Sequence, residues 1–141
     1  MNQPSAAGVS AVVSALARAL DADDFATAGT LLADDCVYQT GRTSLRGPEA
    51  ILASFAEASA RARRDFDEVR QASDVGPVAG TTVTVTFTDY LLKAGGRWHR
   101  HRCQQAFTVG AGGRVTRIVH QELPGEREAL AAYFRECGLE G

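Results

Sequence analysis

The segment 97–109, RWHRHRCQQAFTV, constrains the fold of this chain more than any other stretch. Its residues alternate in character, which is typical of an extended strand because successive side chains point to opposite faces. One face runs from polar to apolar and carries His99, His101, Cys103, Gln105, Phe107 and Val109. The other face carries Trp98, Arg100, Arg102 and Gln104. Histidines that share a face with apolar residues, opposite a face of arginines, predict one wall of a pocket.

Two further segments alternate in the same way and flank the first. Segment 81–92 has mainly threonines on one face, and its other face carries Val83, Val85, Phe87, Asp89 and Leu91. Segment 114–123 alternates Ile118, His120 and Glu122 with Val119 and Gln121. The glycine-containing turns KAGG and GAGG connect these segments to 97–109, so the three predict an antiparallel meander.

Helical periodicity predicts three helices before the meander and one after it. Apolar spacing places them over 8–20, from Asp24 to the Asp34-Asp35 pair, over 49–64 and over 125–137. A strand over 36–40, followed by a turn, and an irregular strand over 66–78 are predicted between them. We therefore expect one α+β domain spanning 1–141, with residues 1–7 flexible, in which helices cover a curved antiparallel sheet that forms a cone.

Composition narrows the class of partner. The chain has 141 residues, and 17 acidic against 15 basic residues give a formal net charge of −2. Such a charge provides no overall field to attract nucleic acid or an anionic membrane, so we expect neither partner. Three cysteines, an odd number, indicate a reducing compartment. No signal peptide or membrane span is expected, and we predict a cytoplasmic protein.

Four motifs carry a resemblance to a known family. They are LDADDF at 20–25, LLADD at 31–35, RGPEAI at 46–51 and the pattern F-x-V-x-x-x-G-R-V at 107–115. With these motifs the chain resembles the nuclear transport factor 2-like superfamily, in its SnoaL-like branch, over about residues 8–135. The resemblance implies a cone-shaped α+β fold and a homodimer formed through the outer sheet face. The fold hosts isomerases, hydrolases, dehydratases, cyclases and non-catalytic binding proteins, so it does not define one reaction.

Individual positions can be compared with enzymes of this superfamily. Tyr38 matches a tyrosine that limonene epoxide hydrolases direct at the catalytic water, and Asp89 matches one of their two catalytic carboxylates. Their other three groups are replaced here by Thr40, Phe87 and His120, so that reaction does not carry over. The ketosteroid isomerase base and tyrosine are also absent, whereas Asp21 matches a cavity aspartate of scytalone dehydratase.

The candidate catalytic residues are Asp89, His101, His120 and Tyr38. A carboxylate in an apolar pocket beside an imidazole can titrate near neutral pH, and which histidine pairs with Asp89 is left open. Tyr38 can donate to a developing oxyanion. The predicted chemistry is proton transfer on a small, mostly apolar molecule: isomerisation, cyclisation, dehydration or epoxide opening. The predicted pocket lining comprises Asp21, Thr40, Phe55, Phe87, His99, Cys103, Gln105, Phe107 and Ile118.

Several alternatives stand beside this prediction. The inward side chains of His99, His101, Cys103 and His120 are possible zinc ligands. Three same-face residues of one strand, spaced roughly 6.5–7 Å apart, do not readily share one ion, so no metal or cofactor is expected. Cys103 is predicted to be a small core residue and not a nucleophile. If the aspartate and histidine only hydrogen-bond each other and do not act on a ligand, the chain would instead be a non-catalytic binding or dimerisation domain.

Overall fold

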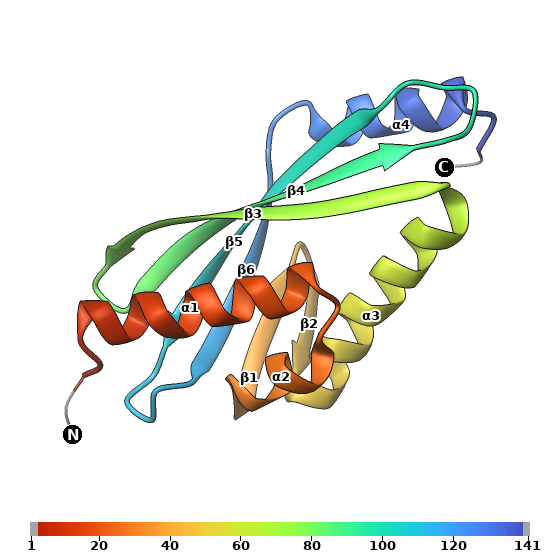
Figure 1. The fold of residues 1–141 in the computed structure, drawn as a ribbon. Coiled ribbons are helices and arrows are strands. Elements are labelled where there is room, and N and C mark those ends of the chain that lie inside the picture. The colour runs from red at the N-terminus through yellow and green to blue at the C-terminus, as the bar shows by residue number, and fades with distance from the viewer. Residues whose placement is uncertain (1–2, 140–141) are drawn as a thin grey trace.

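The computed structural model describes residues 3–139 and has an α+β architecture, as predicted (Figure 1). The described residues form four helices and a single six-stranded sheet. In chain order the elements are α1 (Ala6–Asp21), α2 (Phe25–Thr30), β1 (Leu32–Thr40), β2 (Thr43–Arg46), α3 (Pro48–Asp65), β3 (Glu68–Ala79), β4 (Thr82–Leu92), β5 (His99–Val109), β6 (Val115–Glu122) and α4 (Glu126–Glu136).

The sheet has the strand order β2-β1-β6-β5-β4-β3. Strands β4, β5 and β6 form the antiparallel meander that the alternation predicts. Strand β1 runs parallel to β6, so the sheet is mixed: this one pair is parallel in a sheet that is otherwise antiparallel, as predicted. The parallel pair begins where Val115 N donates to Leu31 O at 2.9 Å. It joins segments far apart in the sequence, as parallel strands require.

The stretch between α2 and α3 also differs from the prediction. Helix α2 ends at Thr30, before the predicted end at the Asp34-Asp35 pair. Strand β1 begins at Leu32, whose side chain is buried and whose backbone pairs with Val115. The segment predicted as a turn contains strand β2, which forms a hairpin with β1. Gly41 makes the hairpin turn with a φ of 54°, a conformation that favours glycine.

Helix α1 begins earlier than expected. The Ser5 hydroxyl accepts a hydrogen bond from Gly8 N at 3.0 Å and so caps a helix that starts at Ala6. The helix predicted over 8–20 therefore starts two residues earlier, and the flexibility expected for residues 1–7 stays a prediction. Residues 1 and 2 lie outside the described part of the chain.

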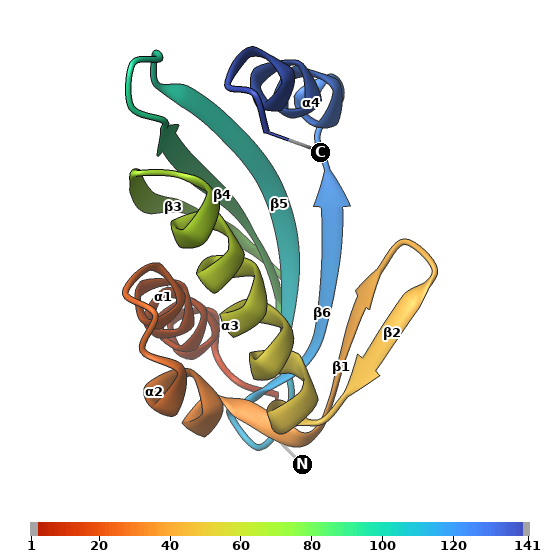
Figure 2. The ribbon, with the colours of Figure 1, turned by 90° about the vertical axis from the view of Figure 1, so that its right-hand side faces the viewer.

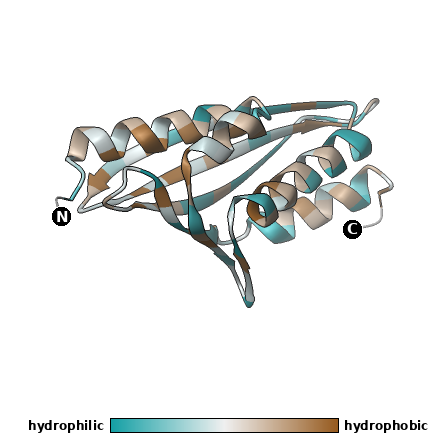
Figure 3. Ribbon diagram, turned by 90° about the horizontal axis from the view of Figure 1, so that it is seen from below, coloured by the Kyte–Doolittle hydropathy of each residue, from teal (hydrophilic) through white to brown (hydrophobic). Residues whose placement is uncertain are grey.

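Helices α1, α2 and α3 lie on the concave side of the curved sheet (Figure 2). Val13 and Leu16 of α1 and Ile51 of α3 contribute to a buried core with Phe107 and Ile118 of the sheet. Polar and apolar residues are interspersed along the helices and strands (Figure 3). Among the helices of residues 3–139, none combines the length and the apolar character needed to cross a membrane.

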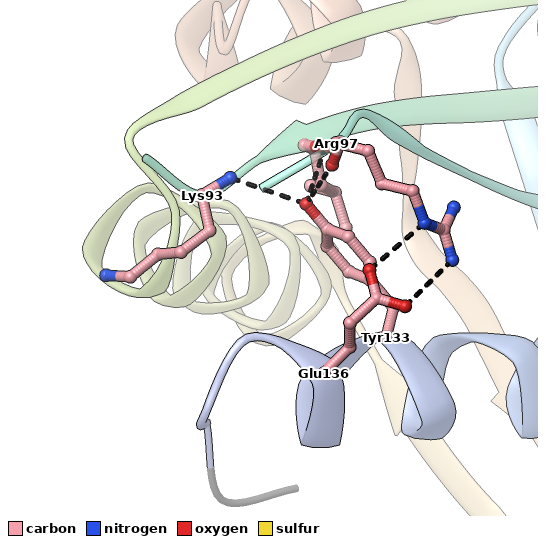
Figure 4. Close-up of polar contacts among 5 residues, drawn as sticks. Lys93, Arg97, Tyr133 and Glu136 are labelled. Atoms are coloured by element: carbon pink, nitrogen blue, oxygen red, sulfur yellow. Dashed lines mark hydrogen bonds and ion pairs between the residues drawn. The ribbon is translucent and has the colours of Figure 1, made fainter. Parts of the chain in front are cut away.

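A second buried cluster, with Phe66, Leu91 and Tyr133 at its centre, fixes helix α4, and Figure 4 shows the polar contacts of its Tyr133. The Tyr133 hydroxyl donates to Arg97 O at 2.6 Å and accepts from Lys93 N at 3.4 Å. The Tyr133 ring stacks on Phe66 and on His99, with centroid distances of 5.9 and 4.8 Å. Tyr133 therefore holds α4 against the start of β5.

The opposite sheet face carries exposed aromatic residues. Tyr90 and Trp98 are 39% and 40% exposed, and the Arg70 guanidinium lies 5.2 Å from the centre of the Trp98 ring. The homodimer that we predict through this face stays a prediction.

Candidate functional site

A cavity of about 270 Å³ lies between the concave sheet face and helices α1 and α3. Pockets for small molecules usually measure roughly 300–1,000 Å³, so this cavity suits a ligand at the small end of that range. Nine of the predicted site residues line it: Asp21, Tyr38, Phe55, Phe87, Asp89, His101, Cys103, Gln105 and His120.

Four predicted lining residues lie outside the cavity. Phe107 and Ile118 are 0% and 1% exposed and belong to the core, where α1 covers the sheet. The Thr40 side chain is a hydrogen-bond partner of Tyr38 and does not reach the cavity. His99 is stacked under the ring of Tyr133. Phe107, Ile118 and His99 are on the predicted face, but the core beneath α1 and the Tyr133 ring of α4 cover the sheet at their positions.

The sheet register shows which side chains are neighbours. Asp89 lies directly opposite His101 of β5 and opposite Gln71 of β3. Residues opposed in this way have Cβ atoms roughly 4.5–5.5 Å apart. His120 lies instead opposite Gln105. The histidine adjacent to Asp89 is therefore His101, and His120 belongs to a separate pair.

Asp89 is an acid of the cavity wall with a perturbed pKa. Burial raises the pKa of its carboxyl, and a nearby Asp21 raises it further. The neighbouring His101 and a hydrogen bond with Gln71 oppose that rise. A raised pKa means that Asp89 can both take up and release a proton closer to neutral pH than an exposed aspartate can.

Two further aspartates lie at the turn after α1. Ser73 Oγ donates to Asp21 Oδ2 at 2.6 Å, which opposes the rise that burial causes in the Asp21 pKa. Asp23 Oδ2 accepts from Ser59 Oγ at 2.8 Å and from Arg63 Nε at 3.2 Å. Both carboxylates accept from a serine hydroxyl, and Asp23 also pairs with Arg63, whereas Asp89 lies between Gln71 and His101. We take Asp89, the carboxylate opposite a histidine, as the candidate base.

Arg63 links the Asp23 turn to the residues around Asp89. Its Nη2 donates to Gln71 Oε1 at 3.4 Å, and Gln71 is the hydrogen-bond partner of Asp89. The Arg63 guanidinium thus contacts two residues that line the cavity, Asp23 and Gln71.

His120 and Tyr38 are held neutral. Gln105 Nε2 lies 3.2 Å from His120 Nδ1, and because a carboxamide nitrogen only donates, Nδ1 accepts and Nε2 carries the proton. Burial lowers the pKa of His120 and raises the pKa of Tyr38, whose ring lies 5.2 Å from that of Phe55. Both residues therefore carry a proton that they can donate in a hydrogen bond.

Cys103 is a thiol and not a thiolate, because burial and the nearby Asp89 raise its pKa to about 12. We expect Cys103 to remain unmodified when the folded protein is treated with iodoacetamide at pH 7, since the thiolate is the reactive form. Peptide mass spectrometry measures this, with guanidinium-unfolded protein as the positive control. Rapid alkylation of Cys103 in the folded protein would contradict the account.

The possible zinc ligands are not gathered at one point. In the chain from residue 3 to residue 139, no cluster of three or more histidine, cysteine or acidic side chains is arranged to hold an ion. His99 faces Tyr133, and His120 contacts Gln105.

Sequence reasoning missed the cavity residues contributed by β3 and part of α3. Val69 and Gln71 of β3 line the cavity, as do Ser54, Ser59 and Ala62 of α3. Spacings of two along β3 and of three to five along α3 were present in the sequence. These spacings did not indicate which face lines a cavity, because small and polar side chains occupy both faces of β3 and α3.

Ionisation of the buried Asp89 carboxyl at high pH lowers the stability of the fold. Its pKa is higher in the folded than in the unfolded chain, so the stability it contributes is fully present below the unfolded pKa and is lost as the pH rises through the folded pKa. We therefore expect Asp89→Asn to stabilise the fold more at pH 8 than at pH 4. Urea unfolding at the two pH values measures this. Asp74→Asn, at an exposed site on the other face, is the control. Equal effects of Asp89→Asn at both values would contradict the expected shift.

Fold and cavity together define a class: an α+β domain whose curved sheet and helices enclose a small-molecule pocket lined by acid-base groups. The family model for the SnoaL-like domain matches residues 13–118, and the chain belongs to this family. Its sequence matches no protein of curated function.

Solved structures share the fold. A candidate polyketide cyclase from Xanthomonas campestris pv. campestris is 19% identical, with a TM-score of 0.63 over 82% of this chain and 90% of that chain. An epoxide hydrolase from Mycobacterium tuberculosis, of the LEH-like type, is 24% identical, with a TM-score of 0.58 over 93% and 98%. Another M. tuberculosis protein, solved with estradiol-17beta-hemisuccinate, is 18% identical, with a TM-score of 0.62 over 84% and 96%.

Proposed function

We propose that this SnoaL-like protein catalyses proton transfer on a small, mostly apolar molecule, with Asp89 as the general base. The observation that supports this most is the position of Asp89 inside the cavity, directly opposite His101, with a pKa that burial raises. A carboxylate whose pKa is raised is a stronger base than an ordinary aspartate, which favours general-base catalysis.

Two other polar groups of the cavity are suited to stabilise the negative charge that proton removal creates. When Asp89 removes a proton from carbon, negative charge develops on an oxygen of the substrate. Tyr38 and the Nε2–H of His120 are neutral donors in the same cavity and are suited to stabilise that oxygen. A conjugated ring lying between Phe55 and Phe87 would delocalise the charge from the carbon beside Asp89 to the oxygen beside Tyr38 and His120.

The relatives support the choice of substrate class. The structural neighbours named above include a candidate cyclase and an epoxide hydrolase, both enzymes of small molecules. Isomerisation, cyclisation and dehydration can each begin with removal of a proton from carbon, whereas epoxide opening begins with removal of a proton from water, so the proposal is made for proton transfer to Asp89. The alternative is a binding protein without catalysis, in which Gln71 and His101 only satisfy the Asp89 carboxylate.

A generic substrate tests the proposal without knowledge of the natural one. A base removes the ring C–H proton of 5-nitrobenzisoxazole, the N–O bond breaks, and a coloured cyano-nitrophenolate forms. We expect protein-dependent ring opening that saturates with the probe and is inhibited by biphenyl. A rate no higher than that of buffer carboxylate at equal concentration would contradict catalysis and favour the binding protein.

A further inference from the structure

Gln105 carries a buried hydrogen-bond acceptor that no protein group satisfies. The residue is 5% exposed and lines the cavity, and its Nε2 is engaged by His120. Its Oε1 is buried without a partner. Buried polar atoms in native proteins nearly always have a partner, so an orphan acceptor that faces a cavity indicates a group supplied by a ligand. A carbonyl oxygen accepts, so the matching ligand group must donate.

A second orphan atom lies at the other end of the cavity. His101 Nδ1 is also buried without a partner, beside Asp89. His101 and Gln105 are four residues apart on the same face of β5, which corresponds to about 13 Å of strand. The cavity therefore has two polar ends, which we call the Asp89 end and the Gln105 end.

The middle of the cavity is apolar. Phe87 of β4 and Cys103 of β5 lie opposite each other between the two ends, and Phe55 of α3 also lines the cavity. The Cys103 side chain is a neutral thiol at physiological pH. Rings of carbon suit such a middle section, whereas a ligand polar throughout does not.

We propose that the cavity binds an elongated ring compound with a hydroxyl group at each end, and that Gln105 selects it by accepting a hydrogen bond from one of them. The other hydroxyl lies at the Asp89 end and meets His101 and the carboxylate. The inference rests on the proposed function in that it takes this cavity as the substrate site. It adds the class of ligand and the residue that recognises it.

Three biphenyls test the proposal by isothermal titration calorimetry of the wild-type protein. They are 4,4′-dihydroxybiphenyl, 4-hydroxybiphenyl and 4-hydroxy-4′-methoxybiphenyl. We expect the dihydroxy compound to bind at least about tenfold more tightly than either of the others, because only it donates at both ends. Equal affinity of the three compounds, or no binding of any, would overturn the proposal, and neither result depends on a variant.

Two variants then locate the effect. Gln105→Leu is expected to reduce the tenfold preference to less than about threefold, because it removes the acceptor. Gln104→Leu, at a neighbouring position bonded to Thr86 at 3.2 Å outside the cavity, is expected to leave the preference unchanged. Gln105→Met serves if the leucine variant does not fold. A preference that survives both Gln105 variants would show that Gln105 does not select the ligand.

This result is separable from the proposed function. If the preference for the dihydroxy compound is found but 5-nitrobenzisoxazole is not opened, the ligand class stands for a binding protein. If the probe is opened and the three biphenyls bind equally, only the ligand class is overturned.

Discussion

The Asp89→Asn protein is expected to open 5-nitrobenzisoxazole at least about a hundredfold more slowly than the wild type, because a positioned general base contributes roughly 10²–10⁴-fold. Asparagine has nearly the same size and still hydrogen-bonds with Gln71, but its amide does not take up a proton. The change therefore removes the base and keeps the cavity. Initial rates followed by the absorbance of the phenolate product give the ratio.

Two matched variants control this prediction. Asp21→Asn changes a second of the three carboxylates that line the cavity, one that accepts from Ser73 Oγ, and is expected to cost much less. Asp74→Asn changes an exposed aspartate on the opposite sheet face and is expected to have no effect. A larger loss in Asp21→Asn than in Asp89→Asn would assign the base to Asp21 and contradict our account.

Tyr133→Ala is expected to reduce the free energy of unfolding by about 3–5 kcal/mol, as large aromatic-to-alanine changes in cores do. The side chain is 1% exposed and stacks on Phe66 and His99, so its loss leaves a void between α4 and the sheet. Domains of this kind are stable by roughly 5–15 kcal/mol in total, so the loss is a large fraction. Urea unfolding at constant pH measures it.

Tyr133→Phe separates packing from hydrogen bonding. It keeps both stacked rings and removes only the hydroxyl that contacts Arg97 O and Lys93 N (Figure 4), so we expect a loss of about 1 kcal/mol. Hydrogen exchange should then show faster opening in α4 than in β4. Equal losses in the phenylalanine and alanine variants would mean that the stacked rings contribute nothing.

The meander could be predicted from sequence because its information is local. Segments 81–92, 97–109 and 114–123 alternate strictly, and glycine turns connect them, so strand existence, order and facing side chains all followed. The parallel pairing of β1 with β6 depends on contacts between distant segments. No local pattern in LLADD distinguishes the end of a helix from the start of a strand that Val115 pairs with.

The candidate site shows a similar division. Alternation gave the face of each residue, which placed Asp89, His101 and Gln105 on the cavity wall. It did not give position along the cavity, because helices α1 and α4 decide where the sheet is covered. For that reason His99 and Phe107, on the same face, lie against Tyr133 and in the core.

The pH dependence of kcat/KM for 5-nitrobenzisoxazole tests the central claim most directly, because it reports the pKa of the essential base in the free protein. We predict a rate that rises with pH and levels off, with a midpoint above the ordinary pKa of an aspartate, and the loss of this curve in Asp89→Asn. A rate that follows the hydroxide concentration without levelling off, and equally in both proteins, would contradict the assignment of Asp89 as the base.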